Sequence, residues 1–325
     1  MRAVVLCPAG AVTGGPEALH QLVHTARALG EDAEIVYLGD GDRTAVPEPY
    51  RHYDVRIGTQ VPDEPGIVVV APEIFAFRLL TLQRAVPALW WLSVDWFDRH
   101  NDGYQRQYGT PLKPLDVLYG RPGVLHLAQS QYALDTVRAR GGDPIMLSDY
   151  LHTSLRAELV DAQVGERADA VAYNPAKGMD TTRRLMDLAP DLTWVPLAGM
   201  THAELARALG GVKAYVDFGE HPGRDRIPRE AALAGACVVV GRRGSAVNDV
   251  DVPIPQEYKV DPAEGPAADR RTVALLRDVL ADHTTHAARF ASYRRWIEDQ
   301  EAAFADETRG VFEAARSAAT VGASA

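Results

Sequence analysis

The sequence has little of three features that would each point to a class of protein. It contains only two cysteines, Cys7 and Cys237, and both stand beside short apolar runs. Two isolated thiols provide neither a disulfide framework nor the spacing of a metal site. No apolar stretch approaches the roughly 20 residues of a membrane-spanning helix, and the first residues do not resemble a signal peptide. We therefore expect a cytoplasmic protein without an integral membrane segment.

An excess of positive charge is also missing. The 325 residues carry a formal net charge of −10, whereas a general nucleic-acid binder needs a basic face, so we expect no nucleic-acid partner. The hydrophobic fraction of 46% and the charged fraction of 24% are typical of globular proteins. A chain of this length usually folds as two domains. In so acidic a chain, a local basic cluster indicates a focused anion site.

Short β-branched runs alternate with helical patterns in the first half. The runs show no polar–apolar alternation, which is typical of parallel strands covered on both faces. We expect strands at Arg2–Cys7, Ala33–Leu38, Gly66–Ala71, Ala88–Val94, Val124–Gln129 and Ile145–Leu147, and helices at Pro16–Leu29, Ile74–Ala85 and Gln131–Arg140. The polar, aromatic segment Asp95–Tyr108 is predicted to be a loop. This half therefore reads as an open α/β sheet with helices on both faces.

A second α/β series follows. We expect strands at Ala170–Tyr173, Leu192–Leu197, Lys213–Phe218 and Ala236–Val240, and helices at Thr181–Leu188, Thr201–Leu209, Ile227–Ala234, Arg270–Asp282 and His286–Ala318. The predicted fold is α/β, with two doubly wound, Rossmann-like domains. The first covers residues 1–150, a linker 151–168, and the second domain 169–285. C-terminal helices in 286–325 are expected to return to the first domain.

One stretch of the second domain concentrates charge just before a buried strand. Residues 217–240 read DFGEHPGRDRIPREAALAGACVVV. Its second part, EAALAGACVVVG from Glu230, resembles the E-A-x-A-x-G-x-P-V-V segment of family 4 glycosyltransferases, with Cys237 at the usual proline. The resemblance implies the GT-B fold and a Glu230 that binds the ribose hydroxyls of a nucleotide. The alternative is that Glu230 is only a carboxylate that favours the start of a helix.

A second segment, AYNPAKG at 172–178, follows the first strand of the second domain. A lysine in such a loop can reach a phosphate, and Gly178 lets the backbone come close. The segment resembles the strand, loop and Lys-Gly pair that open the donor domain of the same family. The resemblance implies that Lys177 binds donor phosphate and that Tyr173 and Pro175 lie beside the nucleotide. A plain surface turn is the alternative.

The segment HPGRDR at 221–226 departs from that family. The family has a second glutamate eight residues before the position of Glu230, where this chain has Pro222. We predict that Arg224 and Arg226 bind the diphosphate, because a guanidinium group matches phosphate oxygens. The residues expected around the sugar are His221, Gly223 and Asp225. The alternative is a solvated charge run that pairs with itself.

The first domain carries the expected acceptor side. Gly14 and Gly15 precede a helix and resemble the family's Gly-Gly loop, which faces the donor phosphates. The segment PALWWLSVDWFDRHNDGY at 87–104 resembles one found in short glycosyltransferase-like proteins, and we place Ser93 and Trp96 near the acceptor. Trp90 and Trp91 are predicted to be core residues.

The resemblance implies a glycosyltransferase that moves a sugar from a nucleotide-diphosphate sugar to a small-molecule or glycan acceptor. The sugar nucleotide would be a co-substrate, with no other cofactor and no metal. The resemblance favours retention of anomeric configuration, and the missing glutamate weakens it. An inverting reaction needs a general base, for which Asp95 and His126 are the candidates, with a loop cap and a core position as their alternatives. A nucleotide-sugar epimerase, a non-catalytic binding or assembly protein, and a homo-oligomer stay open.

Overall fold

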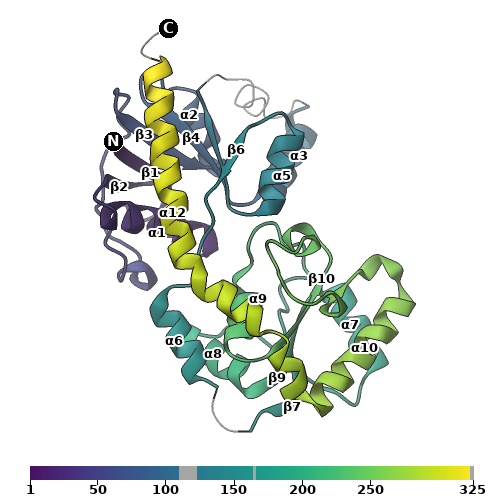
Figure 1. The fold of residues 1–325 in the computed structure, drawn as a ribbon. Coiled ribbons are helices and arrows are strands. Elements are labelled where there is room, and N and C mark those ends of the chain that lie inside the picture. Colours follow the sequence, from purple (N-terminus) through teal and green to yellow (C-terminus); the bar gives the residue numbers. More distant parts are fainter. Residues whose placement is uncertain (110–122, 164–165, 323–325) are drawn as a thin grey trace. The chain divides into compact units, whose positions relative to one another are not determined.

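The computed structural model describes residues 1–109, 123–163 and 166–322, and the chain separates into two compact units (Figure 1). Unit 1 consists of Met1–Asp149 and Ala302–Ala325, and unit 2 of Tyr150–Glu301. The helix α12 (Ala291–Gly322) therefore begins in unit 2 and ends in unit 1. Each unit contains one parallel sheet with helices packed against it.

The sheet of unit 1 has six parallel strands in the order β2-β1-β3-β4-β5-β6. The strands are β1 (Arg2–Pro8), β2 (Asp32–Leu38), β3 (Ile67–Pro72), β4 (Val86–Trp91), β5 (Leu125–Ala128) and β6 (Pro144–Met146). Every residue of the central strands β3 and β4 is buried, as expected for strands covered on both faces. The prediction of an open parallel α/β sheet is confirmed.

Helices cover both faces of this sheet. They are α1 (Gly14–Ala28), α2 (Ala76–Leu79), α3 (Val94–Tyr108), α5 (Gln131–Ala139) and the C-terminal part of α12. Consecutive strand residues point to opposite faces, and the two tryptophans of β4 illustrate this. Trp90 stacks on Phe304 of α12, whereas Trp91 meets Phe97 of α3 edge to face. Both tryptophans are fully buried, so their predicted core role is confirmed.

The helix expected at Ile74–Ala85 is much shorter. A 3₁₀ turn at Glu73–Phe75 leads into the four-residue helix α2, and the chain then turns into β4. The carboxylate of Asp63 accepts hydrogen bonds from the backbone N–H groups of Gln83, Arg84 and Ala85 at 2.8–2.9 Å. These N–H groups are thereby satisfied without a helix, which explains why the predicted helix was wrong.

The loop expected at Asp95–Tyr108 is the helix α3. Ser93 caps its start by accepting a hydrogen bond from the N–H of Trp96 at 3.2 Å. Gly109 ends it in the left-handed conformation, with a φ of 73°. Only Val94 and Phe97 of the helix are buried. Two buried residues are too few to give a recognisable helical periodicity in a segment that is otherwise polar.

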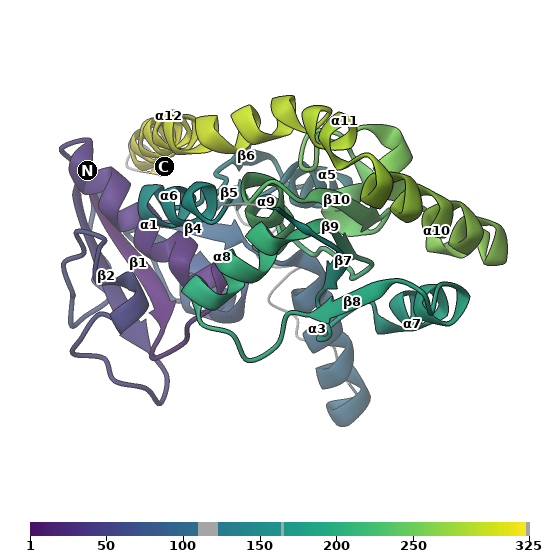
Figure 2. The ribbon, with the colours of Figure 1, turned by 90° about the horizontal axis from the view of Figure 1, so that it is seen from below.

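The sheet of unit 2 has five parallel strands in the order β11-β10-β9-β7-β8. The strands are β7 (Ala168–Tyr173), β8 (Thr193–Pro196), β9 (Val212–Asp217), β10 (Cys237–Gly241) and β11 (Lys259–Val260). The helices are α6 (Thr153–Asp161), α7 (Met179–Leu188), α8 (His202–Gly211), α9 (Arg226–Leu233), α10 (Pro266–Ala281), α11 (His283–Ala288) and the first part of α12 (Figure 2). Helix α7 packs beside α10, and α6, α8 and α9 pack with one another.

Two segments of the second half show more secondary-structure detail than the sequence predicted. The linker expected at 151–168 contains the helix α6, and its residues 164–165 lie outside the described part of the chain. The single helix expected at His286–Ala318 is divided into α11 and α12. Within the described residues, none of the helices combines the length and the apolar composition needed to span a membrane.

The helix α8 offers a test of packing in unit 2, because its last two residues are both glycine. A Cβ atom at Gly210 would stand 2.8 Å from the carbonyl carbon of Ala162, whereas one at Gly211 would have nothing within 4 Å. We expect Gly210→Ala to lower the free energy of unfolding by about 1–3 kcal/mol. Gly211→Ala should leave it unchanged or raise it by up to about 1 kcal/mol. Urea unfolding of the two variants checks this, and equal effects would contradict the packing.

Candidate functional site

The candidate donor site lies in unit 2, where the strand order reverses. The chain passes from β7 to β8 on one side, and β9 and β10 lie on the other side of β7. Ligands of open α/β sheets bind in the crevice at the carboxyl ends of the strands at such a switch point. The loops that leave these ends are 174–178 after β7 and 218–225 after β9.

The two loops touch, and glycine makes the contact possible. Gly178 has a φ of 66°, and a Cβ atom there would stand 2.5 Å from the carbonyl carbon of Phe218. A Cβ atom at Gly219 would stand 2.8 Å from Cγ of Lys177. Side chains at either position would push the loops apart. The aliphatic part of the Lys177 side chain therefore packs directly against the backbone of the second loop.

Four ionisable side chains meet between these loops: Lys177, Asp217, His221 and Asp225. The ammonium group of Lys177 forms an ion pair with Asp225 and lies 3.4 Å from Oδ2 of Asp217. Nδ1 of His221 lies 2.6 Å from the Asp225 oxygen that Lys177 also contacts. Asp217 accepts a hydrogen bond from the N–H of Gly219 at 2.9 Å, which holds the start of the loop.

These contacts shift the protonation of the cluster. Burial alone would lower the pKa of His221, but the hydrogen bond to Asp225 and the charges of Asp217 and Asp225 outweigh it and raise the pKa. Burial opposes the charge of Asp225 as well. The hydrogen bond from His221 and the charge of Lys177 nevertheless lower the pKa of Asp225 to about 2. At neutral pH Asp225 is therefore an ionised carboxylate held between two proton-bearing partners.

The same cluster has the spacing of a metal site. One ligand atom from each of Asp217, His221 and Asp225 lies within 4.8 Å of the others. A cation bound there would have to displace the ammonium group of Lys177, which contacts both carboxylates. It would also have to remove the proton that Asp225 favours on His221. The donor set therefore fits an internally neutralised cluster better than a metal site.

An open pocket of about 560 Å³ adjoins the cluster. Its charged lining consists of Lys177, Arg183, Arg184, Arg243, Asp180 and Glu220, an excess of two positive charges in a chain of net charge −10. Arg184 is paired with Asp269, and Arg243 with Glu220. Arg183 and Arg243 were not predicted, although Arg243 stands two residues after the end of β10, where site residues of such sheets lie.

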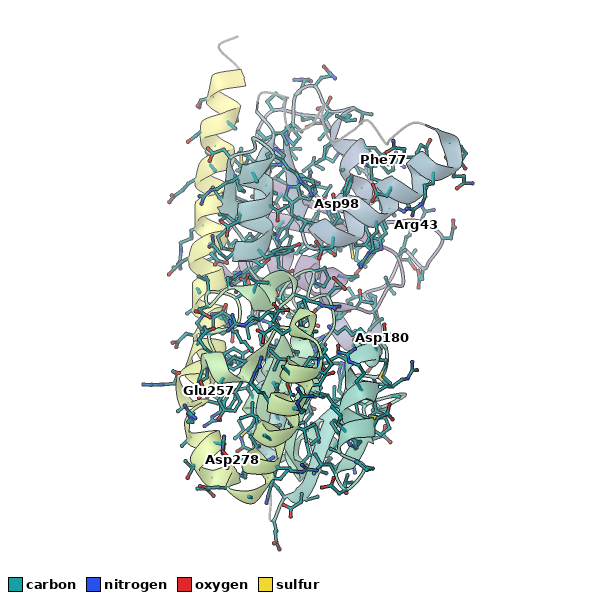
Figure 3. All side chains as sticks on the ribbon, turned by 90° about the vertical axis from the view of Figure 1, so that its right-hand side faces the viewer. Arg43, Phe77, Asp98, Asp180, Glu257 and Asp278 are labelled. Carbon is teal, nitrogen blue, oxygen red and sulfur yellow. The ribbon has the colours of Figure 1, made fainter. Side chains whose placement is uncertain are left out.

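The helix α7 begins at this pocket, with Asp180 in its first turn (Figure 3). Gly178 precedes the helix and has no side chain with which to cap it. The N-cap residue of α7 therefore provides no side-chain acceptor for the first-turn N–H groups, and a helix N-terminus carries partial positive charge. Together with Lys177, this end of α7 forms a site suited to an anion.

The predicted residues of α9 pair with each other. Arg226 donates hydrogen bonds from Nε and Nη2 to Oε1 of Glu230, at 3.1 and 3.0 Å. The Glu230 side chain is only 3% exposed, and that of Arg226 is 20% exposed. For these two residues the geometry matches the alternative considered from the sequence, in which the charged side chains pair with each other. The same pair leaves Arg226 partly accessible at the first turn of α9.

Arg224 does not line the phosphate pocket. Its guanidinium group lies over the ring of Trp296 at 5.1 Å, bonds to Gln300 and lies 3.6 Å from Asp251. In this arrangement Arg224 is engaged by these three partners, and its contact with the diphosphate stays a prediction. Its backbone carbonyl accepts a hydrogen bond from Arg229 at 2.9 Å, so the loop is held from inside.

The remaining residues predicted for the donor side lie in different parts of unit 2. Gly223 is buried, and its carbonyl accepts a hydrogen bond from the Ser245 hydroxyl at 2.7 Å, which holds the loop. Pro175 lines the open pocket. Tyr173 ends β7, half-buried, with its ring 6.5 Å from that of Trp194.

In unit 1, the expected acceptor-side residues lie together. A pocket of about 230 Å³ at the carboxyl ends of β1, β3 and β4 is lined by Gly15, Ser93 and Trp96 among others. Gly14 and Gly15 form the first turn of α1, whose N-cap residue Thr13 makes no side-chain cap. Ser93 caps α3, and Trp96 is 37% exposed and stacks on His100.

The two predicted base candidates are engaged elsewhere. Asp95 accepts a hydrogen bond from the hydroxyl of Tyr132 at 2.7 Å. His126 is 4% exposed, and its Nδ1 accepts from the indole N–H of Trp91 at 3.2 Å, which is the core position considered as the alternative. The pocket instead contains Glu73, which was not predicted. Its signal in the sequence is an acidic residue placed directly after the buried strand β3.

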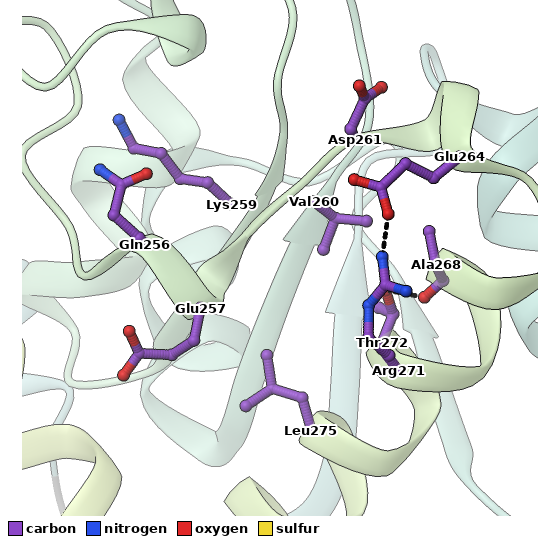
Figure 4. A pocket seen from close by; sticks show the side chains of 10 residues that line it. All are labelled: Gln256, Glu257, Lys259, Val260, Asp261, Glu264, Ala268, Arg271, Thr272 and Leu275. Atoms are coloured by element: carbon purple, nitrogen blue, oxygen red, sulfur yellow. Dashed lines mark hydrogen bonds and ion pairs between the residues drawn. The ribbon is translucent and has the colours of Figure 1, made fainter.

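Another pocket in unit 2, of about 320 Å³, lies between β11 and α10 (Figure 4). Its basic side chains pair with acids, Lys259 with Asp249 and Arg271 with Glu264, as Lys177, Arg184 and Arg243 also do at the switch point. It contains none of the predicted site residues. We therefore place the candidate donor site at the switch point and not here.

The scan against family models and the search of curated proteins both find no match. Solved structures do match. Sucrose-phosphate synthase from Thermosynechococcus elongatus is 12% identical, with a TM-score of 0.66 over 96% of this chain and 98% of that one. The pneumococcal O-GlcNAc transferase GtfA, in complex with UDP and GlcNAc, is 9% identical, with a TM-score of 0.61 over 97% and 99%.

An Escherichia coli structure titled as trehalose-6-phosphate bound with UDP-2-fluoro glucose is 9% identical, with a TM-score of 0.57 over 95% of this chain and 99% of that one. At such identities these likenesses show the fold. The chain has the two-domain, Rossmann-like architecture of GT-B proteins, as the sequence predicted.

The charged cluster makes the stability of the protein depend on pH through His221. Its pKa is raised in the folded protein, so the protonated ring stabilises the fold below the ordinary value of 6.5, and this contribution is lost as the pH rises through the folded value. His221 has a φ of 46°, which asparagine tolerates. We expect His221→Asn to lower the free energy of unfolding more at about pH 5.5 than at about pH 9.

His283 provides a matched control in the same unit. Burial lowers its pKa, so the neutral ring is favoured in the folded protein and protonation destabilises the fold as the pH falls. His283→Asn should therefore show the opposite trend in urea unfolding across the same pH range. A stability loss in His221→Asn that does not change with pH would mean that His221 carries no charge in the cluster.

Proposed function

We propose that the protein is a glycosyltransferase that uses a nucleotide-diphosphate sugar as donor. The observation that carries this proposal is the basic pocket at the switch point of unit 2, where Lys177 stands beside the uncapped start of α7. A diphosphate needs several hydrogen-bond donors and positive charge in one place. In an otherwise acidic chain this pocket supplies both.

The proposed mechanism needs no metal ion. The leaving nucleoside diphosphate gains negative charge as the bond to the sugar breaks. Lys177, Arg243 and the backbone N–H groups at the start of α7 would neutralise this charge, and fixed donors of this kind lower the barrier by electrostatic stabilisation. The Asp217–Asp225 pair holds the Lys177 ammonium group in place before a ligand arrives, because both carboxylates contact it.

The fold supports this assignment. Two of the structural neighbours have titles that name a uridine nucleotide or nucleotide sugar as ligand, and one is a transferase. In this chain the nucleotide would extend toward α9, where Glu230 would accept hydrogen bonds from the ribose and Arg226 would meet the phosphate. The Arg226–Glu230 pair must then open, since each side chain occupies the other in the present arrangement. The acceptor would bind unit 1 in the pocket of Gly15, Ser93 and Trp96.

Binding of the donor can be tested by thermal shift with a panel of nucleoside diphosphates and nucleotide sugars. We expect at least one member to raise the melting temperature, because a ligand that binds only the folded state stabilises it. Lys177→Ala should abolish that shift, since it removes the ammonium group from the pocket. The melting temperature of each variant without ligand serves as its own reference.

Lys213→Ala is the matched control. Lys213 stands at the start of β9, bonds to the carbonyl of Leu280 at 2.7 Å and pairs with Asp169, so it lies at the opposite end of the strand from the pocket. This variant loses the same charge and should keep the full ligand shift. If no compound of the panel raises the melting temperature, or if both variants lose the shift equally, the assignment of the donor site is wrong. Product analysis then separates transfer or hydrolysis from epimerisation and from binding without turnover.

A further inference from the structure

The pocket of unit 1 contains a carboxyl group placed as reacting groups are placed in such sheets. Glu73 directly follows β3, at the carboxyl end of a central strand. The pocket is lined by Thr13, Gly15, Pro16, Ser93, Trp96 and five further apolar residues around Glu73. Among the described lining residues Glu73 is the one ionisable group.

Backbone contacts hold the Glu73 side chain in one position. One carboxylate oxygen, Oε2, accepts a hydrogen bond from the N–H of Leu92 at 3.1 Å. The residue is 8% exposed. Burial raises its pKa to about 7, although hydrogen bonds from the backbone of Glu73 itself, Leu92 and Ser93 act in the opposite direction. A carboxyl group with such a pKa can take up a proton near neutral pH.

Aromatic side chains extend the pocket on one side. A second hollow of about 190 Å³ shares Glu73, Ile74 and Trp96 with the first. It adds Phe77, His100 and Tyr104, and Phe77 is half exposed (Figure 3). The indole of Trp96 and the ring of His100 are stacked in parallel, with centroids 5.0 Å apart. The two hollows thus form one surface that joins a buried carboxyl group to a set of aromatic faces.

The chemistry of this surface matches an uncharged sugar. The C–H faces of a sugar ring stack on aromatic rings, while its hydroxyl groups seek polar partners such as Thr13, Ser93 and Glu73. No lysine or arginine is among the described residues that line either hollow, so an acceptor phosphate would find no counter-charge. A charged lipid head group is therefore a poorer match than a glycoside.

We propose that this surface binds a carbohydrate acceptor and that Glu73 is the catalytic residue that takes the proton from its attacking hydroxyl group. The inference rests on the proposed function and names its acceptor class and base. The hydroxyl oxygen forms a bond to the anomeric carbon of the donor sugar. The bond from that carbon to the diphosphate breaks, and the nucleoside diphosphate leaves with the electron pair. The hydroxyl proton passes to the Glu73 carboxylate.

A single displacement of this kind inverts the anomeric configuration. Retention, which the family 4 resemblance favours, needs no base of this type. This chain departs from the two-glutamate pattern at Pro222, which agrees with a reaction that does not retain the configuration. Glu73 therefore replaces Asp95 and His126 as the base, since both of those side chains are engaged elsewhere.

Kinetics of Glu73→Gln with the donor found by thermal shift tests the base. Glutamine keeps an oxygen to accept from Leu92 but cannot take up the proton. We expect transfer to fall by about a hundredfold or more, with the thermal shift by the donor unchanged. In the native protein kcat/KM should rise with pH and level off above about pH 7, and this step should be lost in the variant. Among the residues that the structure describes, the other ionisable groups lining the joined hollows are His100 and Tyr104.

Glu34→Gln is the control, because Glu34 is a buried carboxylate of the same unit that pairs with Arg2 and Arg56 away from the pocket. It should keep the pH step. Transfer by Glu73→Gln within threefold of the native rate, or a product of retained configuration, would overturn the assignment of Glu73. Loss of the fold in Glu73→Gln would show as a lowered melting temperature, and Glu73→Asp, which keeps a carboxyl group, then decides through its pH profile.

The acceptor class has a test that needs no donor. Saturation-transfer NMR with methyl glycosides of common hexoses and their disaccharides should show contact in the native protein, and Trp96→Ala should weaken it. Absence of contact with every glycoside would overturn the carbohydrate assignment even if a donor binds. If no nucleotide sugar binds but glycosides do, the proposed function fails while the sugar-binding surface stands.

Discussion

The ammonium group of Lys177 is shared by the carboxylates of Asp217 and Asp225, and the candidate donor site depends on this interaction. It joins the loop after β7 to the loop after β9, across the point where the strand order reverses. Glycine at positions 178 and 219 lets the loops meet closely enough for the contact. Because His221 shares the same Asp225 oxygen, the ammonium group of Lys177 belongs to a cluster in which Asp217 and His221 are buried.

A chain of net charge −10 binds an anion only if it isolates positive charge locally. Two devices accomplish this in unit 2. Several of the basic side chains are held by acidic partners that fix their positions, as Asp269 does for Arg184 and Glu220 for Arg243. The start of α7 adds the partial positive charge of a helix N-terminus, and its N-cap residue Gly178 has no side chain to cap it. The site is thus preorganised.

Unit 1 follows a different principle. Its pocket has no basic lining residue in the described part of the chain, and its one ionisable group, Glu73, is buried beside exposed aromatic rings. An environment that disfavours charge raises the pKa of a carboxyl group, whereas the charged cluster of unit 2 lowers that of Asp225. Glu73 can therefore gain and lose a proton near neutral pH, which suits it to proton transfer. Asp225 stays ionised at the same pH, which suits it to hold the ammonium group of Lys177.

The sequence by itself determined the two parallel α/β sheets, because unbroken apolar runs bounded by turns are readable without tertiary information. It also marked Lys177, Gly15, Ser93 and Trp96, which lie in the segments between a strand and the first turn of the next helix. Only the tertiary structure decided where Arg224, Asp95 and His126 point, since each is engaged by a residue distant in sequence: Gln300, Tyr132 and Trp91. Glu73 was missed for the same reason. Its chemistry arises from its burial and from its contact with the backbone of Leu92, and burial belongs to the fold and not to the local sequence.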